Sequence, residues 1–340
     1  MDRRSFAASL ALSFPLLAAA RPFSRKKRLF PRRLQPGDTI GMITPGSYIS
    51  DESLEKAVNN ALKLGFKVKM GKHIRARRGF NAGTDQQRLD DLHLMFSDDT
   101  VGGIWCARGG YGCSRLLPFI DYKLISRNPK ALIGYSDVTA LLNAIYHKTG
   151  LIGFHGPVGA SELTPYTETQ FRAVVMEGKA PYAIPLSEDN MEKEDGAYRT
   201  YTIKTGKAKG ILIGGNLSLL AALAGTEYLP DAKGKLVFME DIGEKPYRID
   251  RMLTQLRQAW GLNQAAGIAM GIYADCQPRE GEPSLSLEET VRDRTENLDI
   301  PAIYGLSFGH IDDQCTLPVG IEAELDVEEQ RLTLLEAAVR

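Results

Sequence analysis

The sequence has few cysteines and no excess of charge of either sign. Only four of the 340 residues are cysteine (Cys106, Cys113, Cys276 and Cys315), and no two of them have CxxC spacing. This pattern indicates neither a zinc site nor a disulfide framework, so we expect reduced, packed thiols. The 42 basic residues balance 42 acidic ones, so no global electrostatic field recruits nucleic acid or an anionic membrane.

Long apolar runs are also missing, apart from one near the N-terminus. Residues 6–17 are largely apolar, follow the pair Arg3–Arg4 and precede three alanines at 18–20. This order is typical of a secretory signal, and the run is shorter than the about 20 residues of a membrane span. We therefore predict a signal peptide over residues 1–24 and a periplasmic mature chain without a membrane span. The pair Arg3–Arg4 is a feature of twin-arginine signals, although the surrounding motif is incomplete. The alternatives are an uncleaved anchor, or a cytoplasmic protein if the leader is not used.

The remaining composition is that of an ordinary globular protein. Hydrophobic residues make up 43% of the chain and charged residues 25%, and the length suggests about two domains. Within residues 34–165, strand-like apolar runs alternate with segments of helical periodicity. This alternation predicts an α/β domain with a Rossmann-like parallel sheet and helices on both faces.

The second half of the chain has a different pattern. Residues 166–205 are polar and irregular, and we expect a connection or surface loop there. Residues 206–330 alternate short apolar runs with glycine and proline turns, which predicts a mixed, strand-rich C-terminal domain. Ligands of α/β sheets bind beyond the carboxyl ends of the strands, so the candidate catalytic residues are expected at those ends.

One such end is the segment ALIGYSDVTALL, residues 131–142. An apolar strand meets Gly134, which would permit a sharp turn, and Asp137 suits the first turn of the helix that follows. A strand–turn–helix corner of this kind holds a side chain exposed above a sheet, as a nucleophile elbow does. The alternative is that Ser136 only caps the helix.

A serine nucleophile requires a base, usually a histidine. Of the five histidines, His310 in LSFGHIDD stands in a glycine-flanked turn after an apolar strand, so it ranks first. His155, in the turn GFHGP, ranks second, and a structural hydrogen bond is the other interpretation of this residue. His73, His93 and His147 are expected away from the site.

The carboxylate that would orient the base also has competitors. Glu240 follows the apolar run KLVFM, where a lone buried charge is costly unless it is paired. Asp241 would face the opposite way in a continuing strand. Glu244 lies in the following loop, and Asp250 with Arg251 is expected to form a structural ion-pair set.

Glycine-rich turns supply a third element. In RGGYG, residues 108–112, an N–H group of the glycines together with that of Asp137 would form an oxyanion hole. A phosphate cradle is the competing use, although the Walker lysine and the GxGxxG spacing are missing. The segment GGN, residues 214–216, either lines the same cleft or serves close packing.

Five motifs occur in order: ARGGYG, IGYSDVTALLNAIYHKTGLIGFHGP, GGNLSLL, FMEDIGEKPYRIDRML, and FGHIDD with TLPVGIEAELD. Together they resemble the LD-carboxypeptidase family of serine peptidases, which includes microcin-C self-immunity peptidases, over residues 34–325. Motif by motif, the resemblance places the serine–glutamate–histidine triad on Ser136, Glu240 and His310. It places the oxyanion donors on Asp137 and on Gly109 or Gly110. It also implies a homodimer that needs no metal or other cofactor.

The resemblance implies hydrolysis of an L,D amide bond that releases terminal D-alanine from a peptidoglycan tetrapeptide. One alternative is hydrolysis of a peptidyl-nucleotide antibiotic, in which an aromatic side chain of the connection would stack on the nucleobase. The available aromatic residues there are Tyr166, Tyr182, Tyr198 and Tyr201. Another alternative is a muropeptide-binding protein without catalysis.

Overall fold

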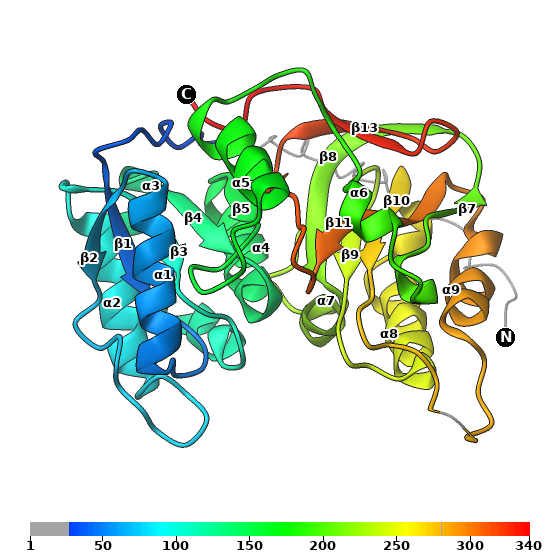
Figure 1. Cartoon of the computed structure of the whole chain (residues 1–340), viewed down its shortest axis with the longest axis horizontal. Coiled ribbons are helices and arrows are strands. Elements are labelled where there is room, and N and C mark those ends of the chain that lie inside the picture. Colours follow the sequence, from blue (N-terminus) through cyan, green and yellow to red (C-terminus); the bar gives the residue numbers. More distant parts are fainter. Residues whose placement is uncertain (1–26, 280) are drawn as a thin grey trace, which may run out of the picture.

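The computed structural model describes residues 27–279 and 281–340, in which two β-sheets lie side by side along the long axis of the molecule (Figure 1). The signal peptide predicted over residues 1–24 lies outside the described residues. No helix within the described part of the chain is long and apolar enough to cross a membrane.

The first sheet is the parallel sheet expected for the N-terminal half. Its strand order is β12-β5-β4-β3-β1-β2, and all its neighbours are parallel except β12 and β5. The strands are β1 (Thr39–Ile43), β2 (Lys67–Met70), β3 (Val101–Cys106), β4 (Ala131–Gly134), β5 (Gly153–His155) and β12 (Leu317–Val319). The helices between them are α1 (Asp51–Lys63), α2 (Asp85–Ser97), the 3-10 helix η1 (Cys113–Phe119), α3 (Tyr122–Arg127), the 3-10 turn η2 (Ser136–Val138) and α4 (Thr139–Thr149).

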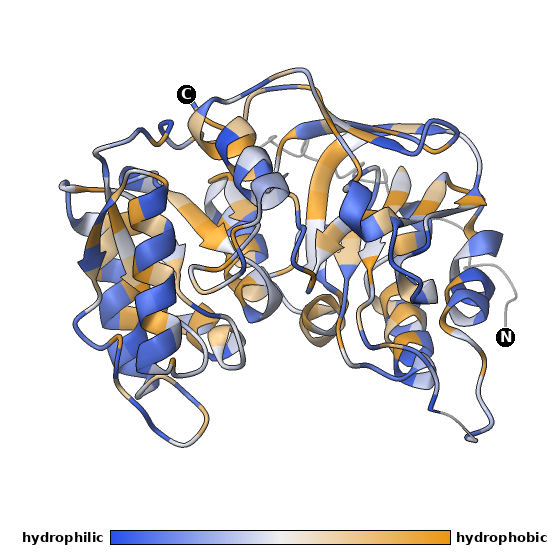
Figure 2. Cartoon of the chain, in the orientation of Figure 1, coloured by the Kyte–Doolittle hydropathy of each residue, from blue (hydrophilic) through white to orange (hydrophobic). Residues whose placement is uncertain are grey.

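Local sequence signals explain where these helices begin and end. Ser50 caps α1 by accepting the N–H of Ser53, and Thr84 caps α2 in a capping box with Gln87. Helix α4 ends at Gly150, whose left-handed backbone conformation terminates the helix without a Cβ clash. The polar face of α1 points to solvent while the strands behind it are apolar (Figure 2).

The connecting segment is more structured than expected. Between residues 165 and 204 lie α5 (Pro165–Phe171), the π-helical turn η3 (Arg172–Met176), β6 (Tyr182–Ile184), α6 (Glu188–Met191), the 3-10 turn η4 (Gly196–Tyr198) and β7 (Tyr201–Lys204). Strands β6 and β7 form the two edges of the second sheet, pairing with β14 and β11. Both runs are short, since β6 has three residues and β7 has four, and the alternation of buried and half-buried residues in β7 is too brief to indicate a strand by itself.

The second sheet is mixed, as expected, with the order β6-β14-β13-β8-β9-β10-β11-β7. Its other strands are β8 (Lys207–Asn216), β9 (Leu236–Glu240), β10 (Gly267–Ile272), β11 (Ala302–Gly309), β13 (Glu322–Asp326) and β14 (Arg331–Leu334). Its helices are α7 (Leu217–Leu223), α8 (Pro246–Ala259), η5 (Leu262–Gln264), α9 (Leu287–Thr295) and η6 (Glu296–Leu298).

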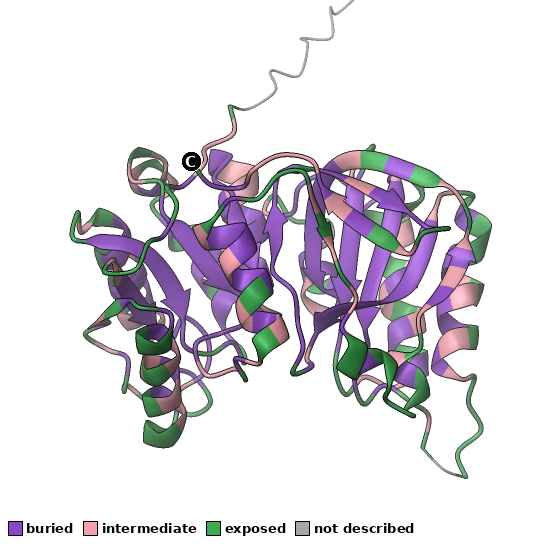
Figure 3. Cartoon of the chain, turned by 45° about the horizontal axis from the view of Figure 1, so that its top comes forward, coloured by how far each residue is buried: buried purple, intermediate pink, exposed green. Residues whose placement is uncertain are grey.

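The two halves share one continuous hydrophobic core, and the central strands of both sheets are buried, whereas β2, β6, β13 and β14 are partly exposed (Figure 3). Strand β12 comes from the C-terminal part of the sequence but pairs with β5 of the first sheet, which ties the halves together. All four cysteines are free and buried, as the lack of pairing motifs predicted.

This topology brings the ends of several strands, and the loops that follow them, to one edge of each sheet. Strands β3, β4 and β5 are parallel and end at Cys106, Gly134 and His155, so the loops that follow them meet at one edge of the first sheet. Strands β8, β9, β10 and β11 are also parallel, and they bring the ends at Glu240 and Gly309 to one edge of the second sheet.

Candidate active site

Ser136 stands at the sharp turn between β4 and α4, with a backbone φ of 61°. A non-glycine residue in this left-handed region carries strain of about 1–2 kcal/mol, which persists only where the surroundings impose it. Ser136 is the first residue of η2, and the N-cap positions of η2 and α4 are Tyr135 and Val138, so Ser136 is not the cap of either helix. The turn is also made differently from our expectation, because Ser136 itself takes the left-handed conformation, and Gly134 instead packs closely against Cys106 and Val138.

The glycine turn after β3 packs directly on this corner. A Cβ atom on Gly109 would lie 3.1 Å from the Cβ of Ser136 and 3.4 Å from the backbone nitrogen of Asp137. Gly110 (φ 93°) instead faces Ser47, with which an added Cβ would collide. Of the two glycines proposed for the oxyanion hole, Gly109 is therefore the one in contact with the serine corner.

Asp137 holds the two turns together. It lies in the first turn of the 3-10 turn η2, as expected, and its buried carboxylate accepts the backbone N–H of Cys113 at 2.8 Å, which joins it to the glycine turn. Burial raises the pKa of Asp137, and the N–H groups of the glycine turn oppose this effect.

Glu240 ends β9 and His310 directly follows β11, the two strands that flank β10 in the second sheet. The Oε2 atom of Glu240 and the Nδ1 atom of His310 are 2.7 Å apart, a charge-assisted hydrogen bond in a site where the carboxylate is fully buried. The adjacent Gly309 has a φ of 130°, and a Cβ there would lie 2.7 Å from the carbonyl oxygen of Ile272 and 3.3 Å from the Cβ of Glu240. Glycine therefore lets the histidine turn approach the carboxylate closely.

The two sheets meet through aromatic contact. The ring of Tyr135, the residue before Ser136, lies with its centroid 4.7 Å from that of His310. His310 is 14% exposed in its side chain, so its ring is held on one side and open to solvent on the other. The structure thus brings the histidine against the chain that carries the serine.

The hydrogen-bonded pair shifts both pKa values. Burial alone raises the pKa of Glu240, but the charge and hydrogen bond of His310 lower it below its ordinary value. Burial likewise lowers the pKa of His310, and the negative charge of Glu240 outweighs it, so the net shift is upward. The pair is therefore favoured in its charged form, which is what a base needs after it accepts a proton.

The competing carboxylates have other partners. Asp241 faces the opposite way, as expected, and accepts hydrogen bonds from Asn216 and from Ser218. Asp250 pairs with Arg294 and not with its neighbour Arg251, because the two adjacent residues of α8 point in different directions.

The other motif residues serve structure. Gly214 and Gly215 allow close packing, since a Cβ on Gly214 would lie 1.8 Å from the carbonyl oxygen of Phe238. Asn216 caps α7. Of the remaining histidines, His73 contacts Asp91, and His93 accepts the N–H of Asp121.

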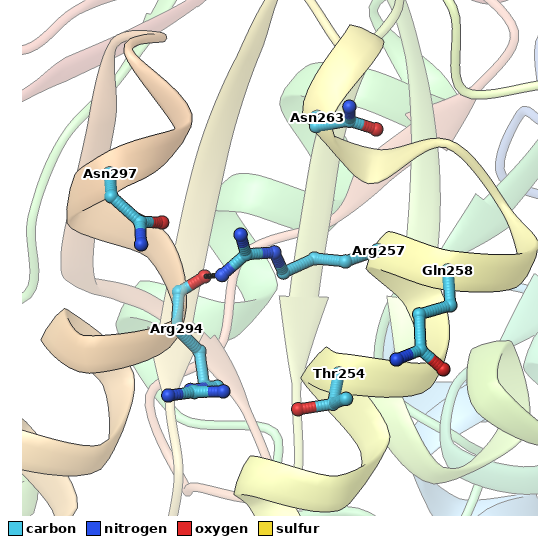
Figure 4. Close-up of a pocket in the computed structure, with 6 residues that line it drawn as sticks. All are labelled: Thr254, Arg257, Gln258, Asn263, Arg294 and Asn297. Carbon is cyan, nitrogen blue, oxygen red and sulfur yellow. Dashed lines mark hydrogen bonds between the residues drawn. The ribbon is translucent and has the colours of Figure 1, made fainter.

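A cavity of about 400 Å³ opens beside the serine corner. Tyr135, Arg108, Tyr48 and Ser161 are among the side chains that line it. Arg108 and Tyr48 were not among the residues predicted from the sequence, although ARGGYG places an arginine directly before the glycine turn. A larger cavity of about 430 Å³ lies elsewhere, between α8 and the α9–η6 segment, and is lined by Arg257, Arg294 and polar amides (Figure 4).

Within residues 27–279 and 281–340, no three His, Cys, Asp or Glu side chains gather in a way that would hold a metal ion. The groups available for chemistry are therefore a serine at a strained turn, glycine amides and a buried carboxylate–histidine pair. This set is typical of serine-type hydrolases.

Comparison with known proteins identifies the family to which the chain belongs. Residues 40–156 match the N-terminal domain of LD-carboxypeptidases and residues 209–325 match their C-terminal domain. The chain belongs to the LD-carboxypeptidase family of peptidases.

Named relatives cover almost the whole chain. The probable murein peptide carboxypeptidase of Bacillus subtilis is 39% identical over 314 residues, which are 91% of this chain and 95% of the relative. The murein tetrapeptide carboxypeptidase of Pseudomonas aeruginosa is 34% identical, covering 86% of this chain and 94% of the relative. The crystal structure of an MccF-like protein from Bacillus anthracis superposes with a TM-score of 0.79 at 32% identity, covering 91% of this chain and 99% of that one.

Proposed function

We propose that this protein is a serine carboxypeptidase that hydrolyses an L,D amide bond and releases terminal D-alanine from peptidoglycan tetrapeptides. The observation that carries the proposal is the 2.7 Å hydrogen bond between Glu240 and His310, whose ring packs on Tyr135 beside the strained Ser136. The names of the relatives, which act on murein peptides, support the substrate class.

In the proposed reaction the hydroxyl oxygen of Ser136 attacks the carbonyl carbon of the penultimate residue. The Nε2 atom of His310 takes the hydroxyl proton and then donates it to the amine of the leaving D-alanine. Glu240 holds the Nδ1–H of His310 and stabilises the imidazolium. Water then hydrolyses the acyl-enzyme, with His310 again acting as the base.

The oxyanion of each tetrahedral intermediate would be held by backbone N–H groups. The amide of Asp137 and an amide of the Gly109 turn border the serine, and each such donor stabilises a transition state by about 3 kcal/mol. Since the left-handed turn at Ser136 fixes these amides before substrate binds, no reorganisation is needed during the reaction.

A carboxypeptidase must also recognise the free carboxylate at the end of its substrate, and Arg108 is suited to this role. Its guanidinium lines the cavity next to the serine corner and donates one hydrogen bond to the carbonyl oxygen of Tyr48. Among the described residues it has no carboxylate partner within ion-pair distance, so it retains donors for a bidentate contact with the substrate.

The direct test incubates purified protein with muramyl tetrapeptide and measures the tripeptide and free D-alanine by mass spectrometry. The Ser136→Ala variant is the matched control and should yield neither product. Absence of product from folded wild-type protein would refute the substrate assignment. Tight muropeptide binding by both proteins without turnover would instead support a binding protein.

The MccF-like neighbour supports one alternative, hydrolysis of a peptidyl-nucleotide. This reaction would use the same serine but would require an aromatic side chain to stack on the base. Tyr166 and Tyr182 donate hydrogen bonds to Pro185 and Gln170, and Tyr201 stacks on Tyr304, so these three rings are engaged within the fold. A competition assay with both substrate classes decides between the activities.

A further inference from the structure

A second histidine lies against the proposed acid of the site. His155 ends β5 and pairs in register with Gly134 of the strand that leads into the serine turn. Its side chain is 1% exposed, and neither ring nitrogen has a hydrogen-bond partner. An unsatisfied polar group in the protein interior costs about 1–3 kcal/mol of stability. Two buried ring nitrogens without hydrogen-bond partners therefore require a compensating interaction.

The missing partner is present on the other side of the sheet interface. Glu240 accepts the hydrogen bond of His310 on Oε2, but its Oε1 is also buried and unpartnered. The Nε2 atom of His155 lies 4.0 Å from this oxygen. A closure of about 1 Å would give an ordinary N–H···O bond and satisfy both atoms at once.

The surroundings of His155 fix both its charge state and its orientation. Burial lowers its pKa to about 4, so the ring is neutral near pH 7 and carries one N–H. The ring meets Phe238 edge-on at 5.2 Å between centroids and Tyr135 edge-on at 6.1 Å. These aromatic walls restrict rotation of the imidazole and keep Nε2 directed at Glu240.

We propose that His155 is a positioning residue, which donates its Nε2–H to Oε1 of Glu240 and so holds the carboxylate in the orientation that binds His310. The proposal rests on the proposed function in that the Glu240–His310 pair is taken as acid and base. The ring is too deeply buried to meet substrate, which also removes His155 as a candidate for the base itself.

The geometric consequence concerns the freedom of the Glu240 side chain. With one oxygen bound, the carboxylate can still rotate about its last side-chain bond and swing Oε2 away from His310. A second hydrogen bond to the other oxygen fixes the plane of the carboxylate, and therefore the plane of the imidazole. Misplacement of a reacting group by about 1 Å costs about a hundredfold in rate.

The experiment compares His155→Leu with His155→Gln. Glutamine places an amide N–H donor near the position of Nε2, whereas leucine fills the space without a donor. For His155→Leu we expect kcat to fall about tenfold to a hundredfold, with KM within about twofold of wild type. His155→Gln should recover most of this loss. His93→Gln, a histidine substitution outside the site, is the matched control and should leave kcat unchanged.

A second readout does not depend on turnover. In the full chain, the Nδ1–H of His310, bound to Glu240, should give a downfield proton NMR resonance. This resonance should shift or be lost by exchange with solvent in His155→Leu and should persist in His155→Gln. Circular dichroism confirms that each variant is folded. An unchanged resonance in folded His155→Leu, or equal kcat losses in the two variants, would overturn the proposal. If wild type shows no turnover but the resonances behave as expected, the proposed function fails and the positioning role stands.

Discussion

His310 Nδ1 and Glu240 Oε2 are 2.7 Å apart, although 70 positions separate the two residues in the sequence. They meet because β9 and β11 both flank β10 in parallel, which carries their ends to the same edge of the sheet. The pair is thus a product of strand order, and the expected behaviour of variants follows from its burial.

Replacing Glu240 by glutamine should preserve the fold and abolish most of the activity. Glutamine has nearly the same size, but it cannot stabilise the imidazolium and presents an amide to His310. We expect kcat to fall about 10⁴-fold with a small change in KM, measured by steady-state release of D-alanine. A variant with more than a tenth of the wild-type kcat would contradict the assigned role of Glu240.

The pH dependence of activity should show an acidic limb above the usual histidine range. In the proposed reaction His310 must be neutral to accept the serine proton, and Glu240 raises its pKa above the ordinary value of about 6.5. The ratio kcat/KM should therefore decline as pH falls through a midpoint higher than about 6.5. A midpoint below that value would show that burial outweighs the charge of Glu240.

The Glu240–His310 pair should also make stability depend on pH, and its contribution to stability should fall as pH rises, whereas activity should increase. Since the pKa of His310 is raised by folding, its contribution to the free energy of unfolding is fully present below pH of about 6.5 and is lost as pH rises through the folded pKa. Chemical denaturation of wild type and Glu240→Gln between pH 6 and 9 tests this. The stability difference between the two proteins should shrink with rising pH, and a constant difference would argue against the coupling.

The strained turn at Ser136 predicts that a substitution that relaxes it will raise stability while removing activity. Ser136→Gly and Ser136→Ala both remove the proposed nucleophile, but only glycine relaxes the left-handed φ of 61°. We expect Ser136→Gly to be more stable than Ser136→Ala by about 1 kcal/mol in thermal or chemical unfolding. Equal stabilities would indicate that the turn carries no strain.

Gly109→Ala should damage catalysis more than folding. The added Cβ would lie 3.1 Å from the Cβ of Ser136 and from the carbonyl oxygen of Tyr135, so it displaces the proposed oxyanion donors. We expect kcat to fall about 10²- to 10³-fold. Gly196→Ala is the control, because its new Cβ has only one neighbour, at 3.6 Å. A loss of activity of similar size in the control would refute the local explanation.

Arg108→Met should weaken recognition of the substrate's end. Methionine keeps part of the apolar stem but removes the guanidinium, so KM for a tetrapeptide with a free carboxylate should rise about tenfold or more. The same substitution should change KM little for a tetrapeptide with an amidated C-terminus. If both substrates respond equally, Arg108 acts on the cavity and not on the carboxylate.

The sequence by itself determined the local pieces of this protein. Helical periodicity and capping residues such as Thr84 gave α2 its start, and the strand-to-helix corner at Ser136 could be identified because apolar runs and turn residues are local signals. The ordered motifs likewise indicated the family and, through the resemblance, Glu240 and His310 as candidate site residues. Their mutual contact remained a prediction, since periodicity within a segment carries no information on its distant neighbours.

Tertiary structure decided the rest. The left-handed backbone of Ser136, the contact of Asp137 with Cys113, and the pairing of β12 with β5 depend on which segments pack together, and local preferences do not fix such contacts. The edge strands β6 and β7 escaped prediction because edge strands are short and half exposed. The approach of His155 to Glu240 also depends on tertiary structure. The two residues lie in different sheets, and their buried polar atoms come close only because the two sheets pack together.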